Sequence, residues 1–117
     1  MLVSPWRETV ARLSNGGDTV PVIESFGNRL AEDLFDDVTS KAVRRFPHEL
    51  RRTARRKLLY LHDAATLRDL EVPPGNRLEA LRGDREGFHS IRINDPWRVV
   101  FVWRDGNAHQ VQVVDYP

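Results

Sequence analysis

The sequence predicts an α+β fold in which two helices pack on one face of a mostly antiparallel sheet of about five strands. Two observations lead to this prediction. The first half of the chain repeats apolar residues at helical spacing, and the second half alternates apolar and polar residues between short Gly, Pro and Asp turns. The length of 117 residues is that of one domain with a single modest core.

The amino-terminal segment is predicted to be an extension. Residues 14–18 (Ser-Asn-Gly-Gly-Asp) form a polar, glycine-rich joint before Pro21. The alternation Val-Ile-Glu-Ser-Phe over 22–26 then predicts a first strand. We therefore expect residues 1–21 to lie outside the conserved domain, which spans 22–117.

Two helices should follow the first strand. From Gly27 onward, Leu30, Leu34 and Phe35 recur at helical spacing, with acidic residues on the other side. A second helix is predicted over about 47–63, with a proline in its first turn, where a missing N–H costs nothing. Its buried face should consist of Leu50, Ala54, Leu58 and Leu61.

The second half of the chain is predicted to consist of strands and turns. Thr66 and Asp69 are spaced for a capping box around one short helical turn, and the prolines at 73–74 prevent a helix from continuing. The third of the later strands is apolar on both faces towards its end, so it should be central in the sheet. Asp105-Gly106 is a hairpin signal. The later strands are expected at 77–81, 88–93, 97–103 and 108–115.

The composition excludes several classes of protein. The chain has no cysteine, so neither a disulfide framework nor a cysteine-ligated zinc site can form. It has no Gly-rich phosphate loop and no paired-histidine metal motif, so we expect no metal and no cofactor. No apolar run approaches the roughly 20 residues of a membrane span, so we expect a cytoplasmic protein without a membrane partner. The scattered histidines are expected to be structural: His48, His62, His89 and His109.

Positive charge is concentrated in one segment. Residues 41–62 carry eight basic residues and one acid, which gives +7, whereas the whole chain has a net charge of only +1. Such a concentration is typical of a surface that binds a polyanion such as RNA, although a solvated helix face would have the same composition. The candidate RNA-binding residues are Arg51, Arg52, Arg55 and Arg56 on the second helix and Arg85 in a later turn.

A second cationic cluster is expected in the strand half. Arg82, Arg98, Asp115 and Tyr116 could converge at one end of the sheet if the last strands pair as hairpins. RNA cleavage needs little else, because the substrate's own 2′-hydroxyl can attack the neighbouring phosphorus while arginines stabilise the developing negative charge. An aromatic ring could stack on a base and hold the geometry. The alternative is that these arginines merely form ion pairs with nearby carboxylates.

A long ordered string in the strand half resembles a known family. The string runs from Pro73 through Gly87 (PPGNRLEALRGDREG), continues with His-Ser-Ile-Arg-Ile-Asn and Trp-Arg, and ends with Val-Asp-Tyr. Over about residues 22–117 the chain resembles the HigB-like, host-inhibition branch of the RelE/ParE toxin superfamily, also described as plasmid-maintenance killer proteins.

The resemblance implies a fold, an activity and partners. The implied activity is that of a type II toxin, a metal-independent endoribonuclease that cuts messenger RNA in the ribosomal decoding site. The implied partners are the ribosome, the message and a helix-turn-helix antitoxin, through which alone the toxin would contact operator DNA. Carried over by position, the implied catalytic residues are Arg82, Arg98, Asp115 and Tyr116.

Two positions depart from the family pattern. Some members have histidine where this chain has Glu79, which could act as a base if it were desolvated. The family ending Asp-Tyr-His is here Asp-Tyr-Pro, and Pro117 can neither transfer a proton nor contact a phosphate. The alternative function is therefore a catalytically weakened or non-enzymatic member that binds antitoxin, ribosome or gyrase.

Overall fold

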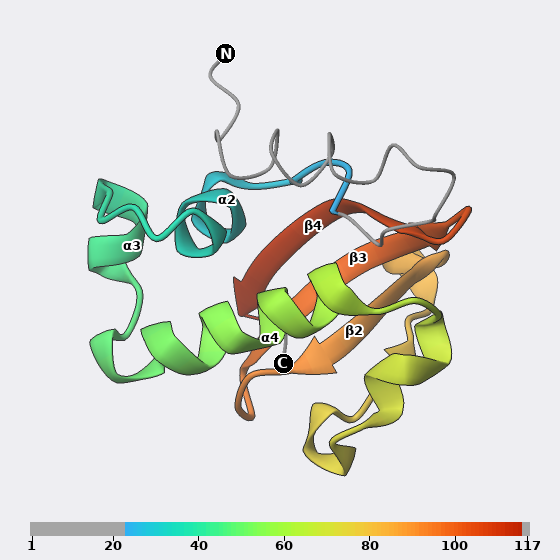
Figure 1. The fold of residues 1–117 in the computed structure, drawn as a ribbon. Coiled ribbons are helices and arrows are strands. Elements are labelled where there is room, and N and C mark those ends of the chain that lie inside the picture. The colour runs from blue at the N-terminus through green and yellow to red at the C-terminus, as the bar shows by residue number, and fades with distance from the viewer. Residues whose placement is uncertain (1–22, 116–117) are drawn as a thin grey trace.

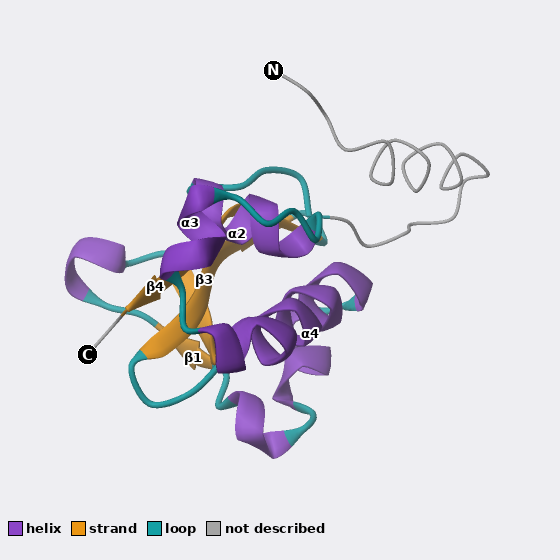
Figure 2. Ribbon diagram, turned by 90° about the vertical axis from the view of Figure 1, so that its left-hand side faces the viewer, coloured by secondary structure: helices purple, strands orange, loops and turns teal. Residues whose placement is uncertain are grey.

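The computed structural model describes residues 23–115 and shows the expected α+β arrangement, with helices on one side of a sheet (Figures 1 and 2). The predicted extension at 1–21, the aromatic Tyr116 and the terminal Pro117 lie outside the described residues. Their predicted roles stay predictions. Among the described residues, no helix is long and apolar enough to cross a membrane.

The sheet is an antiparallel meander of four strands in the order β1-β2-β3-β4. The prediction that the strand beginning at Trp97 is an inner one is confirmed, because β3 pairs with a neighbour on each side. At the β3–β4 hairpin, Asp105 and Gly106 both have positive φ (55° and 79°), as an Asp-Gly turn requires. The strands are β1 (Glu79–Ala80), β2 (Phe88–Arg92), β3 (Trp97–Arg104) and β4 (Asn107–Asp115).

The predicted first strand is present only as an irregular fifth segment. Ile23 and Phe26 form isolated parallel bridges to β4, at Ala108 and Val111. The pairing between this segment and β4 is irregular because β4 contains a β-bulge. The bulge lies opposite the stretch of β3 between Val100 and Val102, and Gln110 within it has φ 54°. The segment still covers the outer edge of β4, so that edge is not left open to another strand.

Three helices pack on the same side of the sheet (Figure 2): α2 (Arg29–Phe35), α3 (Lys41–Arg45) and α4 (Arg51–Asp63). The second predicted helix is confirmed as η1 (His48–Leu50) continuing into α4. The short α3 was not expected. It begins because the Ser40 hydroxyl accepts a hydrogen bond from the Val43 amide, and only Val43 of its five residues is buried.

Asn28 fixes α2 to the sheet. Its side chain accepts a hydrogen bond from the Ala31 amide and thereby caps the helix. The same amide group donates to the Val113 carbonyl at 2.9 Å, so the start of α2 is joined to β4. The direction in which α2 leaves the sheet is set by this contact.

The core lies between the helices and one face of the sheet. Along β3, Val99 and Phe101 point towards the helices, where the buried α4 residues Ala54, Leu58 and Leu61 meet them, as the helical spacing predicted. His62 belongs to this layer. Its Nδ1 accepts a hydrogen bond from the Ile23 amide at 3.1 Å, and its ring contacts Phe35, so its structural role is confirmed.

Short 3-10 turns complete the chain: η2 (Leu67–Glu71), η3 (Pro74–Asn76) and η4 (Gly83–Arg85). The predicted capping box at the start of η2 is present, with Thr66 and Asp69 bonded reciprocally. Asn76 at the end of η3 is fully buried. It accepts a hydrogen bond from Lys57 Nζ of α4 at 2.5 Å and donates to the carbonyls of Leu70 and Val72, so this loop is tied to α4.

Candidate active site

Two arginines lie opposite each other on the inner strands β2 and β3, at one end of the sheet. Arg92, the last residue of β2, pairs in register with Arg98 near the start of β3. Paired residues of antiparallel strands point to the same face, and this is the face turned away from the helices, because Val99 and Phe101 point the other way. Like charges directly opposite one another destabilise a sheet. The pair therefore costs stability, which suggests that it serves binding.

The turn between the strands partly compensates this repulsion. Asp95 forms an ion pair with Arg92, with 2.6 Å between the carboxylate oxygen and the guanidinium nitrogen. The Arg98 guanidinium donates hydrogen bonds to the backbone carbonyls of Asn94 and Trp97. The hydrogen bond and the charge of Arg92 hold the pKa of the Asp95 carboxyl below its usual value, and Arg98 and Arg77 lower it further. Three guanidinium groups thus lie close to one carboxylate, which leaves a net positive site suited to a phosphate.

Positive charge is also present on α4. Lys57 of α4 is buried, and its burial together with the charges of Arg56 and Arg92 lowers the pKa of its ammonium group. The charges of both arginines therefore reach Lys57, although the Arg92–Arg98 pair is on the face of the sheet turned away from the helices.

Glu79 lies on the same face as the arginine pair. It is opposite Ser90 in the register, and Ser90 is two residues along β2 from Arg92, so Glu79 and Arg92 are diagonal neighbours at roughly 7–8 Å between Cα atoms. Its side chain is exposed, so the described surroundings do not desolvate it. Ser90 is fully buried, and its hydroxyl forms no hydrogen bond among residues 23–115.

The strand register does not bring Arg82 and Arg98 to one end of the sheet, as the hairpin pattern had predicted for them. Leu81 bonds to Phe88 at the start of β2, whereas Arg98 pairs with the last residue of that strand. The offset is four residues, or about 13 Å along the strands. Successive turns of an antiparallel meander lie at alternate ends, so the turn with Arg82 and Arg85 is at the opposite end.

Asp115 is at the arginine end of the sheet. It pairs with Trp97, the neighbour of Arg98 in β3, and it is exposed. Because it pairs with Trp97 and not with Arg98, it points to the helix-side face at the last described residue. Among the described residues, no group of three or more His, Asp or Glu side chains could hold a metal ion.

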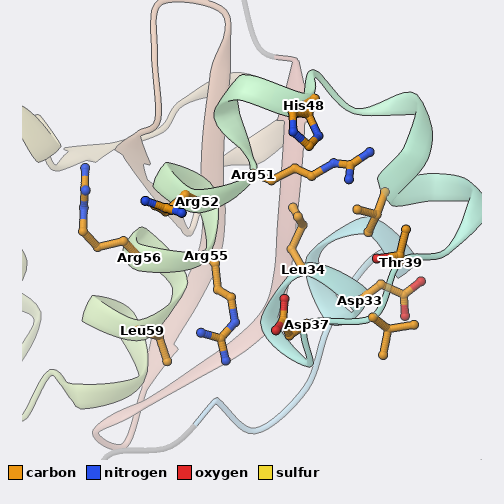
Figure 3. A pocket seen from close by; sticks show the side chains of 12 residues that line it. Asp33, Leu34, Asp37, Thr39, His48, Arg51, Arg52, Arg55, Arg56 and Leu59 are labelled. Carbon is orange, nitrogen blue, oxygen red and sulfur yellow. The ribbon is translucent and has the colours of Figure 1, made fainter.

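The four arginines of α4 line an open groove of about 570 Å³ between this helix and α2 (Figure 3). Arg51 and Arg55 extend towards α2, and Arg52 and Arg56 extend away from it. None of the four forms an ion pair within the described part of the chain, where the pairs present are Arg68–Glu71 and Arg92–Asp95. Within residues 23–115, no ion pair therefore neutralises the positive charge of these four arginines.

Comparison with known proteins identifies the family. Residues 24–116 match the family described as RelE-like toxin of type II toxin-antitoxin system HigB. The chain belongs to this family. A type II system joins a toxin protein to an antitoxin protein, so membership implies an antitoxin as the partner of this HigB-like toxin.

Two curated relatives agree with the assignment. The chain is 39% identical over 83 residues to Toxin HigB-1 of Vibrio cholerae, which covers 71% of this chain and 85% of the relative. It is 40% identical over 40 residues to Endoribonuclease HigB of Proteus vulgaris, which covers 34% of this chain and 44% of that protein.

Several residues of the candidate site were not predicted from the sequence. Arg92 was within the string that resembles the family, and its alternation with Ser90 could have placed it on the face of Arg98. Arg77 was also within that string, but its place in the site could not be predicted, because it has a left-handed backbone (φ 47°) after η3 and lies outside the regular strand. Lys57 was counted in the basic segment, but burial and its bond to Asn76 depend on tertiary packing.

Proposed function

We propose that this HigB-like toxin is an endoribonuclease that cuts messenger RNA on the ribosome by attack of the substrate's own 2′-hydroxyl. The observation that supports this most strongly is the in-register pair of Arg92 and Arg98, held beside Arg77 and only partly neutralised by Asp95. Such a group of guanidiniums favours a phosphate whose negative charge grows during the reaction. The printed name of the Proteus vulgaris relative, an endoribonuclease, supports the same activity.

The proposed reaction needs only the RNA and a few side chains. The 2′-oxygen forms a bond to phosphorus while the bond from phosphorus to the next nucleotide's 5′-oxygen breaks. The proton of the 2′-hydroxyl passes to a base, and the departing 5′-oxygen takes up a proton. The products are a 2′,3′-cyclic phosphate and a 5′-hydroxyl end. Because the nucleophile belongs to the substrate, the protein's contribution is orientation and charge stabilisation.

We assign roles to side chains by their place on the sheet. Arg92 and Arg98 bind the scissile phosphate. Glu79, on the same face, accepts the 2′-hydroxyl proton once bound RNA excludes water from it. Asp115 orients the chain end, and Tyr116 stacks on a base. Arg82 and Arg85, at the other end of the meander, would contact a different phosphate of the same extended strand.

The basic face of α4 would hold the toxin on the ribosome. Arg52 and Arg56 extend away from α2 and have no ion-pair partner within residues 23–115. Each cation that neutralises a phosphate should add about one unit to the salt slope of binding, without regard to sequence. The antitoxin would be a helix-turn-helix protein that also supplies the contact to operator DNA.

One observation favours a second candidate function. The family ending Asp-Tyr-His is here Asp-Tyr-Pro, so the terminal imidazole is absent from this sequence. A member without that group could bind antitoxin and ribosome, or a protein such as gyrase, and cut little or no RNA.

The test is induced expression of the toxin without its antitoxin, followed by mapping of message ends. New 5′ ends within coding regions are expected, together with arrested translation. A reporter message without a ribosome-binding site should stay intact, because cleavage requires the ribosome. Arg98→Gln should remove the new ends, and Arg104→Gln, on the same strand at the other end of the sheet, should keep them. Arrested growth with intact messages would support the non-enzymatic alternative instead.

A further inference from the structure

The groove between α2 and α4 is lined by oppositely charged side chains that form no ion pair with each other within residues 23–115. One wall presents Arg51 and Arg55 of α4, and the other presents Asp33 and Asp37 from α2 and the turn that ends it (Figure 3). No ion pair joins the two walls within the described part of the chain. Between them lie the apolar side chains of Leu34, Val38, Val43 and Leu59.

Several polar atoms in the groove are buried without a partner. Asp33 is only 6% exposed, yet its Oδ2 accepts no hydrogen bond from any described residue. The Nε atoms of Arg51 and Arg55 are likewise shielded from solvent, and neither donates a hydrogen bond within residues 23–115. A buried polar atom without a partner costs stability. The groove therefore holds one acceptor and two donors, which a ligand reaches when the side chains that cover them move.

The arrangement separates the arginines of α4 into two pairs. Arg51 and Arg55 are one turn apart, so they lie on one face of the helix and extend towards α2. Arg52 and Arg56 lie on the adjacent face and extend away from α2, and Arg56 is close enough to Lys57 to lower the pKa of its ammonium group. All four arginines line the groove, but only Arg51 and Arg55 extend across it towards α2.

The chemistry of the groove fits a polypeptide better than RNA. An RNA strand carries a negative charge at each phosphate, and the carboxylates of Asp33 and Asp37 would repel it. An extended polypeptide has N–H donors for Asp33 and can bring carboxylates to Arg51 and Arg55. Its apolar side chains can cover Leu34 and the half-exposed Val38, whose exposure is 49%.

We propose that this groove binds an extended, acidic segment of the antitoxin, with its carboxylates on Arg51 and Arg55 and a backbone N–H on Asp33. The inference rests on the antitoxin that family membership implies, and it does not require that the toxin cuts RNA. The groove lies on the helix side of the molecule, so antitoxin binding there uses different side chains from the arginine pair of the sheet.

The test uses full-length toxin and the antitoxin encoded beside its gene, with affinity measured by titration calorimetry. The toxin carries Arg98→Gln throughout, so that neither its toxicity nor the cleavage proposal affects the result. Arg51→Glu with Arg55→Glu should weaken binding by at least about 30-fold, as removal of a desolvated charge contact does. The matched control is Arg52→Glu with Arg56→Glu, the same charge change one residue further along the helix, which should weaken binding less than about fivefold.

Further measurements keep the result interpretable. Arg51→Gln with Arg55→Gln is a milder variant, and thermal unfolding of every variant checks that the toxin is folded. Equal losses for both pairs would overturn the proposal, because general attraction between a basic helix and an acidic protein would then suffice. Unchanged antitoxin binding, with ribosome binding lost in the Arg51/Arg55 variant, would also overturn it and would assign the groove to RNA.

Discussion

Arg92 and Arg98 lie directly opposite each other on neighbouring antiparallel strands, on the face of the sheet turned away from the helices. A sheet selected only for stability would place an acid or an apolar residue opposite an arginine. Asp95 compensates by its 2.6 Å contact to Arg92, but its carboxylate is 91% exposed and remains open to exchange with another anion. A phosphate of RNA could therefore replace part of this compensation.

The bond between Lys57 and Asn76 should be important for stability. Asn76→Ala leaves a buried ammonium group and two carbonyls, those of Leu70 and Val72, without partners. We expect a loss of about 3 kcal/mol in the free energy of unfolding, measured with urea. Lys57→Met combined with Asn76→Ala should cost less than the sum of the single changes, by more than about 1 kcal/mol. Additive single effects would show that the two side chains are not coupled.

Gly27 should be required by close packing. A Cβ atom at this position would lie 2.7 Å from Gln112 Cγ and 2.9 Å from the Gln110 carbonyl oxygen, which belongs to the backbone and cannot turn aside. Gly27→Ala should therefore destabilise the toxin by about 1–3 kcal/mol. Gly75→Ala is the control, because a Cβ there meets nothing within 4 Å. If the two variants melt at the same temperature, the close contact between the first segment and β4 is wrong.

The elements of this fold that local sequence determines could be predicted, whereas those that depend on contacts distant along the chain could not. The helix α4 could be predicted because Ala54, Leu58 and Leu61 follow one face, and the last hairpin because Asp105-Gly106 determines its own turn. The irregular first segment could not, since it depends on Gly27 meeting a bulge more than 80 residues away along the chain. Nor could α3, which is short and buries only one residue.

The candidate site was predictable in its chemistry and only partly in its geometry. The basic helix and Arg98 were found from charge and from the family resemblance. Arg82 and Arg98 are at opposite ends of the meander, because successive turns of an antiparallel sheet alternate between its two ends. Arg77 joins the site only through tertiary structure, because it follows η3, which the bond between Lys57 and Asn76 ties to α4.

His89 should make the fold sensitive to acid. Its ring is half-buried against Phe101, and this burial lowers the pKa of the imidazole from 6.5. As pH falls through 6.5, the unfolded chain binds a proton that the folded chain does not, so stability decreases. His89→Gln should reduce the difference in melting temperature between about pH 7.5 and about pH 5.5. His48→Gln, at an exposed position, should keep the wild-type difference, and an unchanged slope in His89→Gln would contradict the assignment.

Pro117→His should increase the cleavage rate. The change restores the terminal imidazole of the family, which can transfer a proton near neutral pH. A general acid or base contributes a factor of about 10²–10⁴, so a weak wild-type toxin should gain part of that range on programmed ribosomes. Equal rates for the two forms would indicate that another group moves the proton, with Glu79 as the first to test by Glu79→Gln.

The most direct test of the account is the single-turnover cleavage rate of Arg98→Gln on purified programmed ribosomes, compared with wild type and with Arg104→Gln. Loss of one group that stabilises the developing charge should slow cleavage by about 10²–10³. The free energy of unfolding should change by less than about 1 kcal/mol, because relief of the repulsion from Arg92 offsets the lost hydrogen bonds. Arg104→Gln should stay within about twofold of wild type. An Arg98→Gln toxin that cuts ribosome-bound message as fast as wild type would contradict the central claim.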